Sequence, residues 1–265
     1  MHMASPAAKR LRAGGVRLPI AVTKPRAVLL AVQVPTDTVL DSEGPLLVAK
    51  VPDVWLRLQK FEFETEAINA DTFERAAKNI GRAAATPLPQ SEITTVGLAC
   101  TSMSFMLGPE RVRAELTSGA GSGGAKTTDM ALAQVAALRA LGAKGVALVT
   151  PYIADVAAKN VAMLTSAGFS VVSHETMGLT HDSMTDKVST ATIHEWALAV
   201  NCAAADVVVV GCSALRACGP GFIDELELAL GKPVVTSTQA FLWRMLRVAG
   251  IDDQIDGYGT LFAKH

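Results

Sequence analysis

The sequence lacks the features typical of membrane proteins, disulfide-stabilised proteins, and metal- or nucleotide-binding proteins. No apolar stretch approaches the roughly 18 residues that a membrane-spanning helix needs, and no secretory signal precedes the apolar segments. The four cysteines are irregularly spaced and form no Cys-x-x-Cys pair, which argues against a disulfide framework and a zinc site. No glycine-rich phosphate-binding loop follows a predicted strand. We therefore expect a soluble, cytoplasmic protein that needs no metal or cofactor and binds no membrane.

Acidic residues are absent from residues 1–26, although the whole chain has a formal net charge of −1. This segment carries six basic residues: Lys9, Arg10, Arg12, Arg17, Lys24 and Arg26. We interpret it as a disordered tail, with a mitochondrial transit peptide as the alternative. Because the basic residues stop where the apolar segments begin, we expect no binding to nucleic acid.

The composition indicates a large buried core. Half of the residues are hydrophobic, and the mean hydropathy is +0.32. Parallel sheets covered by helices on both faces have such a composition, because their strands are apolar throughout. Apolar strand-like segments alternate with amphipathic helix-like segments along the 265 residues, which predicts a doubly wound α/β fold of one or two domains.

Two stretches of the chain end in the same way: Val96–Phe105 (VGLACTSMSF) and Val207–Arg216 (VVVVGCSALR). Each begins as an apolar run typical of a buried parallel strand and reaches a cysteine followed by small hydroxyl residues. Both then continue to a Gly-Pro pair, where proline suits the first position of a helix. Open α/β folds bind ligands where strands end in this way. We therefore expect Cys100 and Cys212 to face each other across one site.

The similarity between the two stretches extends over most of the chain. Residues 29–39 match residues 146–156, and residues 126–142 match residues 232–250. Three pairs of matched positions are 116, 112 and 108 residues apart, which is steady enough for a duplicated unit with small insertions. We expect two flavodoxin-like parallel-sheet halves, related by a pseudo-dyad, with the active site between them.

The predicted division of the chain follows from this repeat. The first half covers residues 27–125 and is joined by the C-terminal helix and tail, at about 238–265, whereas the second half covers residues 126–237. Strands are expected at residues 27–34, 58–63, 96–100, 146–150, 169–173, 207–210 and 233–236. Helices are expected at residues 71–80, 110–117, 153–168, 193–200, 220–231 and 241–246, the first with a capping-box pattern at Asp71 and Glu74. The run Gly119–Gly124 is expected to be a flexible loop or a lid.

The paired cysteines predict proton-transfer chemistry. A thiol near a helix N-terminus has its thiolate stabilised, so its pKa is expected to fall toward neutrality. Two such thiols on opposite faces of a carbon can remove a proton from one side and return one to the other. The hydroxyls of Thr101, Ser102 and Ser213, with adjacent amides, could bind a carboxylate and stabilise the enediolate that forms.

Other residues have simpler interpretations. A single cysteine at a strand end is commonly a small buried hydrophobe, and we assign this role to Cys202 and Cys218, which have no counterpart in the first half. His181 is the one histidine in a loop that could reach the site, and we expect it on the surface. Tyr152, in the loop equivalent to Thr36, either faces the substrate or is packed in the core.

Four short motifs resemble those of a known family: Ala99–Ser102 (ACTS), Gly211–Ser213 (GCS), Thr150–Tyr152 (TPY) and Gly257–Phe262 (GYGTLF). They look like the aspartate/glutamate racemase superfamily, and in particular its branch of arylmalonate decarboxylase and maleate cis-trans isomerase. The resemblance covers roughly residues 27–262.

The resemblance implies a role for each matching residue. Cys100 and Cys212 would be the catalytic pair, with Thr101, Ser102, Tyr152 and Ser213 binding the substrate carboxylate. The family's first loop corresponds to Val34–Thr38 and adds Pro35, Asp37 and Thr38 as binding residues. Asp37 stands where maleate isomerases tend to have asparagine, and Cys100 stands where the decarboxylase has glycine.

The sequence therefore predicts a cofactor-independent isomerase or racemase that acts at a carbon next to a carboxylate. A decarboxylase of substituted malonates is the nearest alternative. A non-catalytic small-molecule binding protein is the third, although such a receptor gains nothing from two thiols. The expected partner is a small carboxylic or dicarboxylic acid, and a homo-oligomer is compatible with the sequence.

Overall fold

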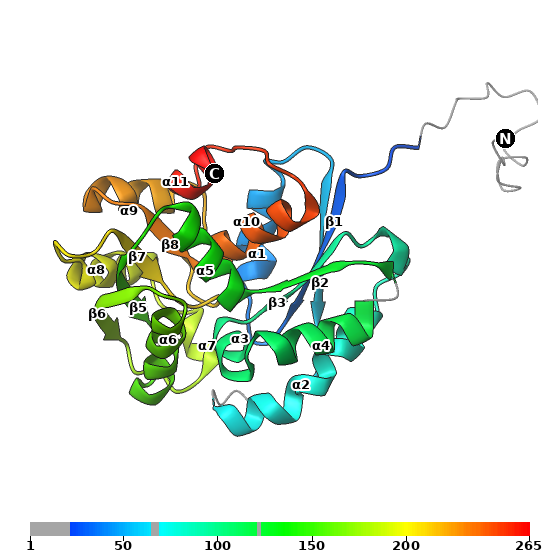
Figure 1. Ribbon diagram of the computed structural model, residues 1–265, viewed down its shortest axis with the longest axis horizontal. Coiled ribbons are helices and arrows are strands. Elements are labelled where there is room, and N and C mark those ends of the chain that lie inside the picture. The colour runs from blue at the N-terminus through cyan, green and yellow to red at the C-terminus, as the bar shows by residue number, and fades with distance from the viewer. Residues whose placement is uncertain (1–21, 65–68, 121–122) are drawn as a thin grey trace, which may run out of the picture.

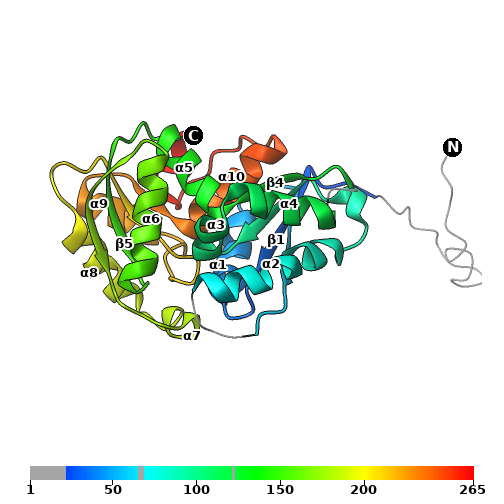
Figure 2. The ribbon, with the colours of Figure 1, turned by 60° about the horizontal axis from the view of Figure 1, so that its bottom comes forward.

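The protein consists of two four-stranded parallel sheets with helices packed against them (Figures 1 and 2). This description comes from a computed structural model that describes residues 22–64, 69–120 and 123–265. The first sheet contains β1 (Ala27–Gln33), β2 (Val54–Lys60), β3 (Thr95–Ala99) and β4 (Lys126–Asp129), in the order β2-β1-β3-β4. The second contains β5 (Gly145–Thr150), β6 (Ser170–Thr176), β7 (Val207–Val210) and β8 (Val234–Thr236), in the order β6-β5-β7-β8. The two orders correspond strand for strand, which confirms the predicted duplication.

Helices connect the strands, as crossovers between parallel strands require. The helices are α1 (Val39–Val48), α2 (Ala70–Ala85), α3 (Thr101–Leu107), α4 (Pro109–Ala120), α5 (Met130–Ala140), α6 (Ala154–Ser166), α7 (Asp182–Thr185), α8 (Thr190–Val200), α9 (Phe222–Leu230), α10 (Ser237–Ala249) and α11 (Gly259–Lys264). A 3₁₀ turn, Gln90–Glu92, precedes β3. Short polar side chains cap several helix N-termini, where backbone N–H groups lack partners: Asn69 caps α2, Asp129 caps α5, and Thr236 forms a capping box with Gln239 on α10.

Helix α10, which directly follows the last strand of the second sheet, packs on the first sheet, against β1, β3 and β4. Gly97 in β3 permits this close packing, because a Cβ atom there would lie 2.6 Å from the Phe241 ring. One predicted boundary is wrong. Residues 126–129, which we assigned to the start of the second half, form β4 and pair with β3 in the first sheet.

Two local predictions in the first half are also wrong. The second strand is Val54–Lys60 rather than 58–63, because the apolar Phe61 and Phe63 follow the strand and pack in the core with Phe73 of α2. The cap of α2 is Asn69, whose side chain accepts a hydrogen bond from the Thr72 amide at 3.0 Å, rather than Asp71.

The two cysteine strands continue differently, although the sequence predicts the same continuation. A short helix, α3, begins directly after Cys100 and precedes the predicted helix at Pro109. After Cys212 the backbone turns without a helix until Phe222. The pseudo-symmetry of the two halves is therefore broken at the site itself.

Most of the predicted basic tail and part of the Gly119–Gly124 run lie outside the described residues. Arg26, which we assigned to the disordered tail, is held by Asp253 through two bonds of 2.8 and 2.6 Å. Within the part of the chain that the structure describes, no helix combines the length and the apolar character needed to cross a membrane.

Candidate active site

The two cysteines occupy equivalent strand ends of the two sheets. Cys100 directly follows β3 and has an extended backbone before α3, whereas Cys212 lies two residues beyond β7. Both side chains are buried, with 4% and 5% of their surface exposed. Gly211 lets the chain pass close to α6, since a Cβ atom there would lie 3.1 Å from Asn160 Oδ1.

Tyr152 lies close enough to both thiols to interact with each of them. It follows β5 directly after Pro151, is almost fully buried, and interacts electrostatically with both Cys100 and Cys212. Its buried hydroxyl has no hydrogen-bond partner of normal length among the described residues, although it is near enough to the Cys212 thiol to lower the pKa of that thiol. Phe105 of α3 packs edge-on against its ring, with ring centroids 6.0 Å apart. A group from the second half thus reaches the cysteines of both halves.

Neutral donors surround each sulfur. The Cys100 Sγ atom is 3.7 Å from the Ser102 hydroxyl, and the Met103 amide also interacts with it. The Ala214 amide interacts with the Cys212 thiol in the same way. Such donors favour a thiolate, as they would favour a substrate carboxylate.

The predicted lowering of the thiol pKa values is nevertheless wrong for the buried site. Burial raises the pKa of Cys100 to about 12, with the Asp182 carboxylate as the second cause. Burial and Asp182 also raise the pKa of Cys212 well above its ordinary value. Desolvation disfavours a charged thiolate more strongly than the nearby N–H groups favour it. Both thiols therefore hold their protons at neutral pH in this structure.

Helix α7 of the second half is bound to the loop after β1 of the first half. The Thr36 hydroxyl donates to Asp182 Oδ2 at 2.9 Å, and the Thr38 hydroxyl donates to Asp186 Oδ2 at 2.9 Å. Both views place α7 at the boundary of the two halves, on the side away from the C-terminus (Figures 1 and 2). These bonds hold the Asp182 carboxylate where it acts on Cys100, Cys212 and Tyr152.

Asp37 lies in the same loop and is fully buried. Its Oδ1 atom accepts hydrogen bonds from the amides of Val39 and Leu40, at 3.0 and 3.3 Å. Its Oδ2 atom has no hydrogen-bond partner of normal length among the described residues, although Ser213 is near enough to lower the pKa of the carboxyl. Burial outweighs these bonds and raises the pKa of Asp37 to about 7.

The other predicted binding residues take different positions. The Thr101 hydroxyl donates to the Met130 sulfur at 3.3 Å, so its backbone amide is the group left to bind substrate. The Pro35 carbonyl accepts a hydrogen bond from Lys60 at 3.2 Å. His181 is exposed and pairs with its neighbour Thr180, as expected of a surface histidine.

Asp182 is a residue of the site that we did not predict from the sequence. We named only its neighbour His181 as a residue whose loop could reach the site, whereas the Asp182 carboxylate is the residue that interacts electrostatically with both thiols. The sequence does contain a signal for it. Asp182 ends the polar loop Gly178–Asp182, which follows β6, and the carboxyl end of β6 lies at the same edge of the sheet as Tyr152 after β5.

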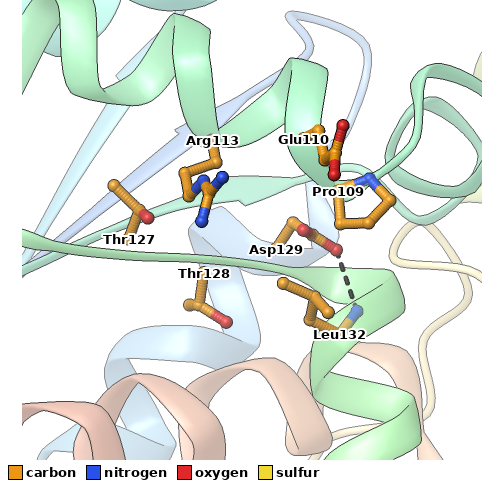
Figure 3. Close-up of a pocket in the computed structure, with 7 residues that line it drawn as sticks. All are labelled: Pro109, Glu110, Arg113, Thr127, Thr128, Asp129 and Leu132. Carbon is orange, nitrogen blue, oxygen red and sulfur yellow. Dashed lines mark hydrogen bonds between the residues drawn. The ribbon is translucent and has the colours of Figure 1, made fainter.

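A separate hollow of about 280 Å³ lies between the N-terminal ends of α4 and α5 (Figure 3). Its lining residues are Pro109, Glu110, Arg113, Thr127, Thr128, Asp129 and Leu132. Asp129 caps α5 by accepting from the Leu132 amide at 2.9 Å, and burial raises its pKa to about 6. None of the predicted site residues lines this hollow, so it is distinct from the site of the two thiols. In the described parts of the chain, no cluster of three or more histidine, cysteine or acidic side chains could hold a metal ion.

The raised pKa of Asp37 predicts that the free energy of unfolding depends on pH. The folded protein holds the Asp37 proton up to about pH 7, whereas the unfolded chain loses it near the ordinary value of 3.8. Stability should therefore fall as the pH rises from about 4 to about 7. A difference of one unit between the folded and unfolded pKa values corresponds to about 1.4 kcal/mol. Asp37→Asn should therefore increase the free energy of unfolding by up to roughly 4 kcal/mol at pH 8 and hardly at all at pH 4.

Urea denaturation at both pH values measures this effect. Asp71→Asn, at an exposed carboxyl, is the matched control and should leave the difference between the two pH values as in the wild type. Equal stabilisation by Asp37→Asn at pH 4 and pH 8 would contradict the assignment.

Comparison with known proteins agrees with the motifs. A model of the arylmalonate decarboxylase family matches residues 52–262. The chain is 33% identical to the arylmalonate decarboxylase of Bordetella bronchiseptica over 178 residues, which cover 66% of this chain and 73% of that protein. It is 27% identical to the maleate isomerase of Nocardia farcinica over 168 residues, which cover 62% and 66% of the two chains.

Solved structures show the same fold. A cysteine-to-serine mutant of the Nocardia farcinica maleate cis-trans isomerase, with a covalently bound succinylcysteine intermediate, superimposes with a TM-score of 0.81 at 20% identity, covering 90% of this chain and 99% of that one. A double mutant of arylmalonate decarboxylase in its liganded form gives a TM-score of 0.77 at 26% identity, covering 90% and 100%. The family match extends over most of the chain and confirms the resemblance drawn from the motifs. This chain therefore belongs to the arylmalonate decarboxylase family.

Proposed function

We propose that this protein is a cofactor-independent isomerase or racemase in which Cys100 and Cys212 exchange protons with opposite faces of a carbon next to a carboxylate. One observation carries this proposal. The two halves deliver a buried thiol from equivalent strand ends, and Tyr152, Asp37 and Asp182 each act on both thiols. A shared environment of this kind is what a two-sided proton transfer needs.

The reaction requires one thiolate and one thiol. The thiolate takes the proton from the carbon, forming an S–H bond, and the C–H electron pair moves into the carboxylate to give an enediolate. The second thiol then protonates the opposite face and becomes the thiolate. The protonation states of Cys100 and Cys212 are exchanged after each turnover, so no redox cofactor is consumed.

The substrate carboxylate would be held by neutral donors. The amides at the start of α3, the amides after Cys212 and the hydroxyls of Ser102, Ser213 and Tyr152 are the groups at hand. Fixed N–H and O–H dipoles in a buried site stabilise the extra negative charge of an enediolate better than water does, because they need no reorganisation.

Decarboxylation is the second candidate, and the 33% identity to arylmalonate decarboxylase favours it. In that reaction a C–C bond breaks, CO₂ leaves, and one thiol protonates the enediolate. The presence of Cys100, where the resemblance implies glycine in the decarboxylase, favours the two-thiol reaction. For cis-trans isomerisation, the succinylcysteine in the related isomerase supports a cysteine that also adds to a double bond.

Incubation in deuterated water tests the proposal. The chelator-treated protein is mixed with single enantiomers of 2-substituted carboxylic acids and amino acids, with maleate, and with 2-aryl malonates. We expect one acid to gain a single deuterium at the carbon next to the carboxylate and to lose its optical purity, or maleate to become its trans isomer. Mass spectrometry and chiral chromatography measure both effects, and Cys202→Ala should behave as the wild type does.

Two outcomes would contradict the proposal. A malonate that loses CO₂, while every other acid keeps its hydrogen, would identify a decarboxylase. Binding of an acid by calorimetry without exchange, isomerisation or decarboxylation would identify a non-catalytic binding protein.

A further inference from the structure

An acidic residue lies on the buried face of helix α1. The buried residues of this helix are spaced as one face of an amphipathic helix: Val39, Leu40, Glu43, Gly44, Leu47 and Val48. Glu43 is the charged residue of this set, and 9% of its surface is exposed. Carboxylates are seldom buried so deeply unless they have a partner. The partner of Glu43 therefore indicates what the residue does.

That partner belongs to the Cys212 segment, residues 211–221. The Glu43 Oε2 atom accepts a hydrogen bond from the backbone amide of Cys218 at 2.7 Å, between positions 175 residues apart in the sequence. Both views place α1 on the side of the first sheet that faces the second half (Figures 1 and 2). The bond therefore joins the first half to the segment that carries the thiol of the second half. A hydrogen bond from an amide to a carboxylate is about twice as strong as one between neutral groups.

The Cys212 segment needs a partner of this kind. Its residues form no helix or strand, and the stretch from Gly211 to Cys218 is buried apart from Arg216. Buried backbone amides need hydrogen-bond partners, and a segment outside helices and sheets must find them elsewhere in the fold. Without the Glu43 carboxylate, the buried Cys218 amide would lose its acceptor, which favours opening of the segment.

Helix α1 and the loop before it meet the Cys212 segment at two points. Asp37, in the loop, is near enough to Ser213 for the hydroxyl of that serine to lower the pKa of the Asp37 carboxyl. Glu43, further along, binds the Cys218 amide. A helix is a rigid element that holds attached groups precisely. These two contacts therefore fix the position of the Cys212 segment relative to the first half and its thiol.

The C-terminal motif Gly257–Phe262 packs against the same contact. The carbonyl of its first residue accepts a hydrogen bond from the Gly221 amide at 3.1 Å. Tyr258 is fully buried and interacts electrostatically with Cys218 and Glu43. A hydrogen bond is electrostatically stronger where the local dielectric constant is low, so the buried ring strengthens the bond between Glu43 and the Cys218 amide. The motif, which the two-thiol reaction does not use, thus supports the Cys212 segment.

We propose that Glu43 is a positioning residue, which holds the Cys212 segment against α1 through the Cys218 amide and thereby sets where the Cys212 thiol lies relative to Cys100. This inference rests on the two-thiol function proposed above. Two thiols that serve opposite faces of one carbon must keep their separation, since a misplacement of about 1 Å can reduce turnover about a hundredfold. Because the thiols come from different halves, a bond between the halves controls that separation.

Two conservative variants separate the reach of the side chain from its charge. Glu43→Asp keeps the charge but is one methylene shorter, so it loses the bond to the Cys218 amide. Glu43→Gln loses the charge but keeps an acceptor oxygen at the same reach, so it keeps the bond. Alkylation by iodoacetamide, followed by mass spectrometry of the peptides, measures how often each buried thiol is exposed by local opening. Thermal unfolding verifies that both variants are folded.

The expected effect is specific to one thiol. Glu43→Asp should raise the alkylation rate of Cys212 at least about tenfold, because the Cys212 segment opens more often when the Cys218 amide has no acceptor. Cys100, which lies between β3 and α3, should react as in the wild type. With the acid identified by deuterium exchange, the kcat of Glu43→Asp should fall at least about tenfold. Glu43→Gln should keep both the alkylation rates and the kcat close to those of the wild type.

Glu227→Asp is the matched control. Glu227 of α9 is also a partly buried acid that accepts from a backbone amide, that of Val234 at 2.9 Å, but it lies outside the Cys212 segment. The same shortening there should lower the temperature of thermal unfolding and leave the alkylation rates of the two thiols and the kcat unchanged.

Several results would overturn the inference: an unchanged Cys212 alkylation rate in Glu43→Asp, an equal increase at Cys100, the same increase in Glu43→Gln or in Glu227→Asp, or a wild-type kcat in Glu43→Asp. The alkylation rates need no substrate, so they are independent of the proposed reaction. Full exchange activity in Cys100→Ala would show that the two-thiol function is wrong, even where the alkylation rates follow the prediction.

Discussion

Replacement of either Cys100 or Cys212 by alanine is expected to reduce turnover at least about a hundredfold, the low end of the loss when a positioned acid or base is removed. In the proposed reaction each thiol serves one face of the substrate carbon, and neither can replace the other because the proton must arrive on the face opposite to its departure. Alanine keeps the Cβ atom of each buried residue, so both variants should remain folded. Rates of racemisation or isomerisation measure the effect, and thermal unfolding verifies the fold.

The other two cysteines provide the controls. Cys202 is partly exposed and Cys218 is buried away from the proposed reaction, where its amide donates to Glu43 Oε2 at 2.7 Å. Cys202→Ala should retain wild-type turnover, and Cys218→Ala should lose far less than the two site variants. Near-normal turnover in Cys100→Ala or in Cys212→Ala would exclude the two-thiol mechanism.

The strands that carry the cysteines could be predicted because they are buried on both faces. In β3 and β7 every residue is buried, so each strand reads as a continuous apolar run in the sequence. The edge strand β2 is only half-buried, and its signal was weaker than that of Phe61 and Phe63 beyond its end. The prediction therefore placed that strand too late in the chain.

The acidic character of the site could not be predicted, because it depends on tertiary contacts. Helix α7 has four residues, too few for a periodic pattern, and its bond from Thr36 to Asp182 joins positions 146 residues apart. The direction of the thiol pKa shifts was wrong for the same reason. The helix N-terminus after Cys100 can be inferred from the sequence, whereas the depth of burial and the nearby carboxylates cannot.

Cys100→Gly should convert the site from a two-sided to a one-sided proton donor. Glycine suits the extended backbone at this position and is accepted before a helix, so α3 should persist. Only Cys212 can then deliver a proton to the enediolate, because the buried site excludes water as a competing donor. Racemisation or isomerisation should fall by at least about a hundredfold, and any remaining protonation should come from one face.

Decarboxylation of a prochiral malonate tests this expectation, because the configuration of the product shows which face was protonated. A 2-aryl malonate that loses CO₂ gives an enediolate that either thiol could protonate, and the face of protonation sets the configuration of the product. We expect Cys100→Gly to give mainly one enantiomer and Cys212→Gly to give mainly the other. Both are combined with Asp182→Asn, which removes the charge that would repel the second carboxylate. Chiral chromatography of the two product mixtures measures the result, and racemic product from both variants, or the same hand from both, would mean that the thiols do not flank the substrate carbon.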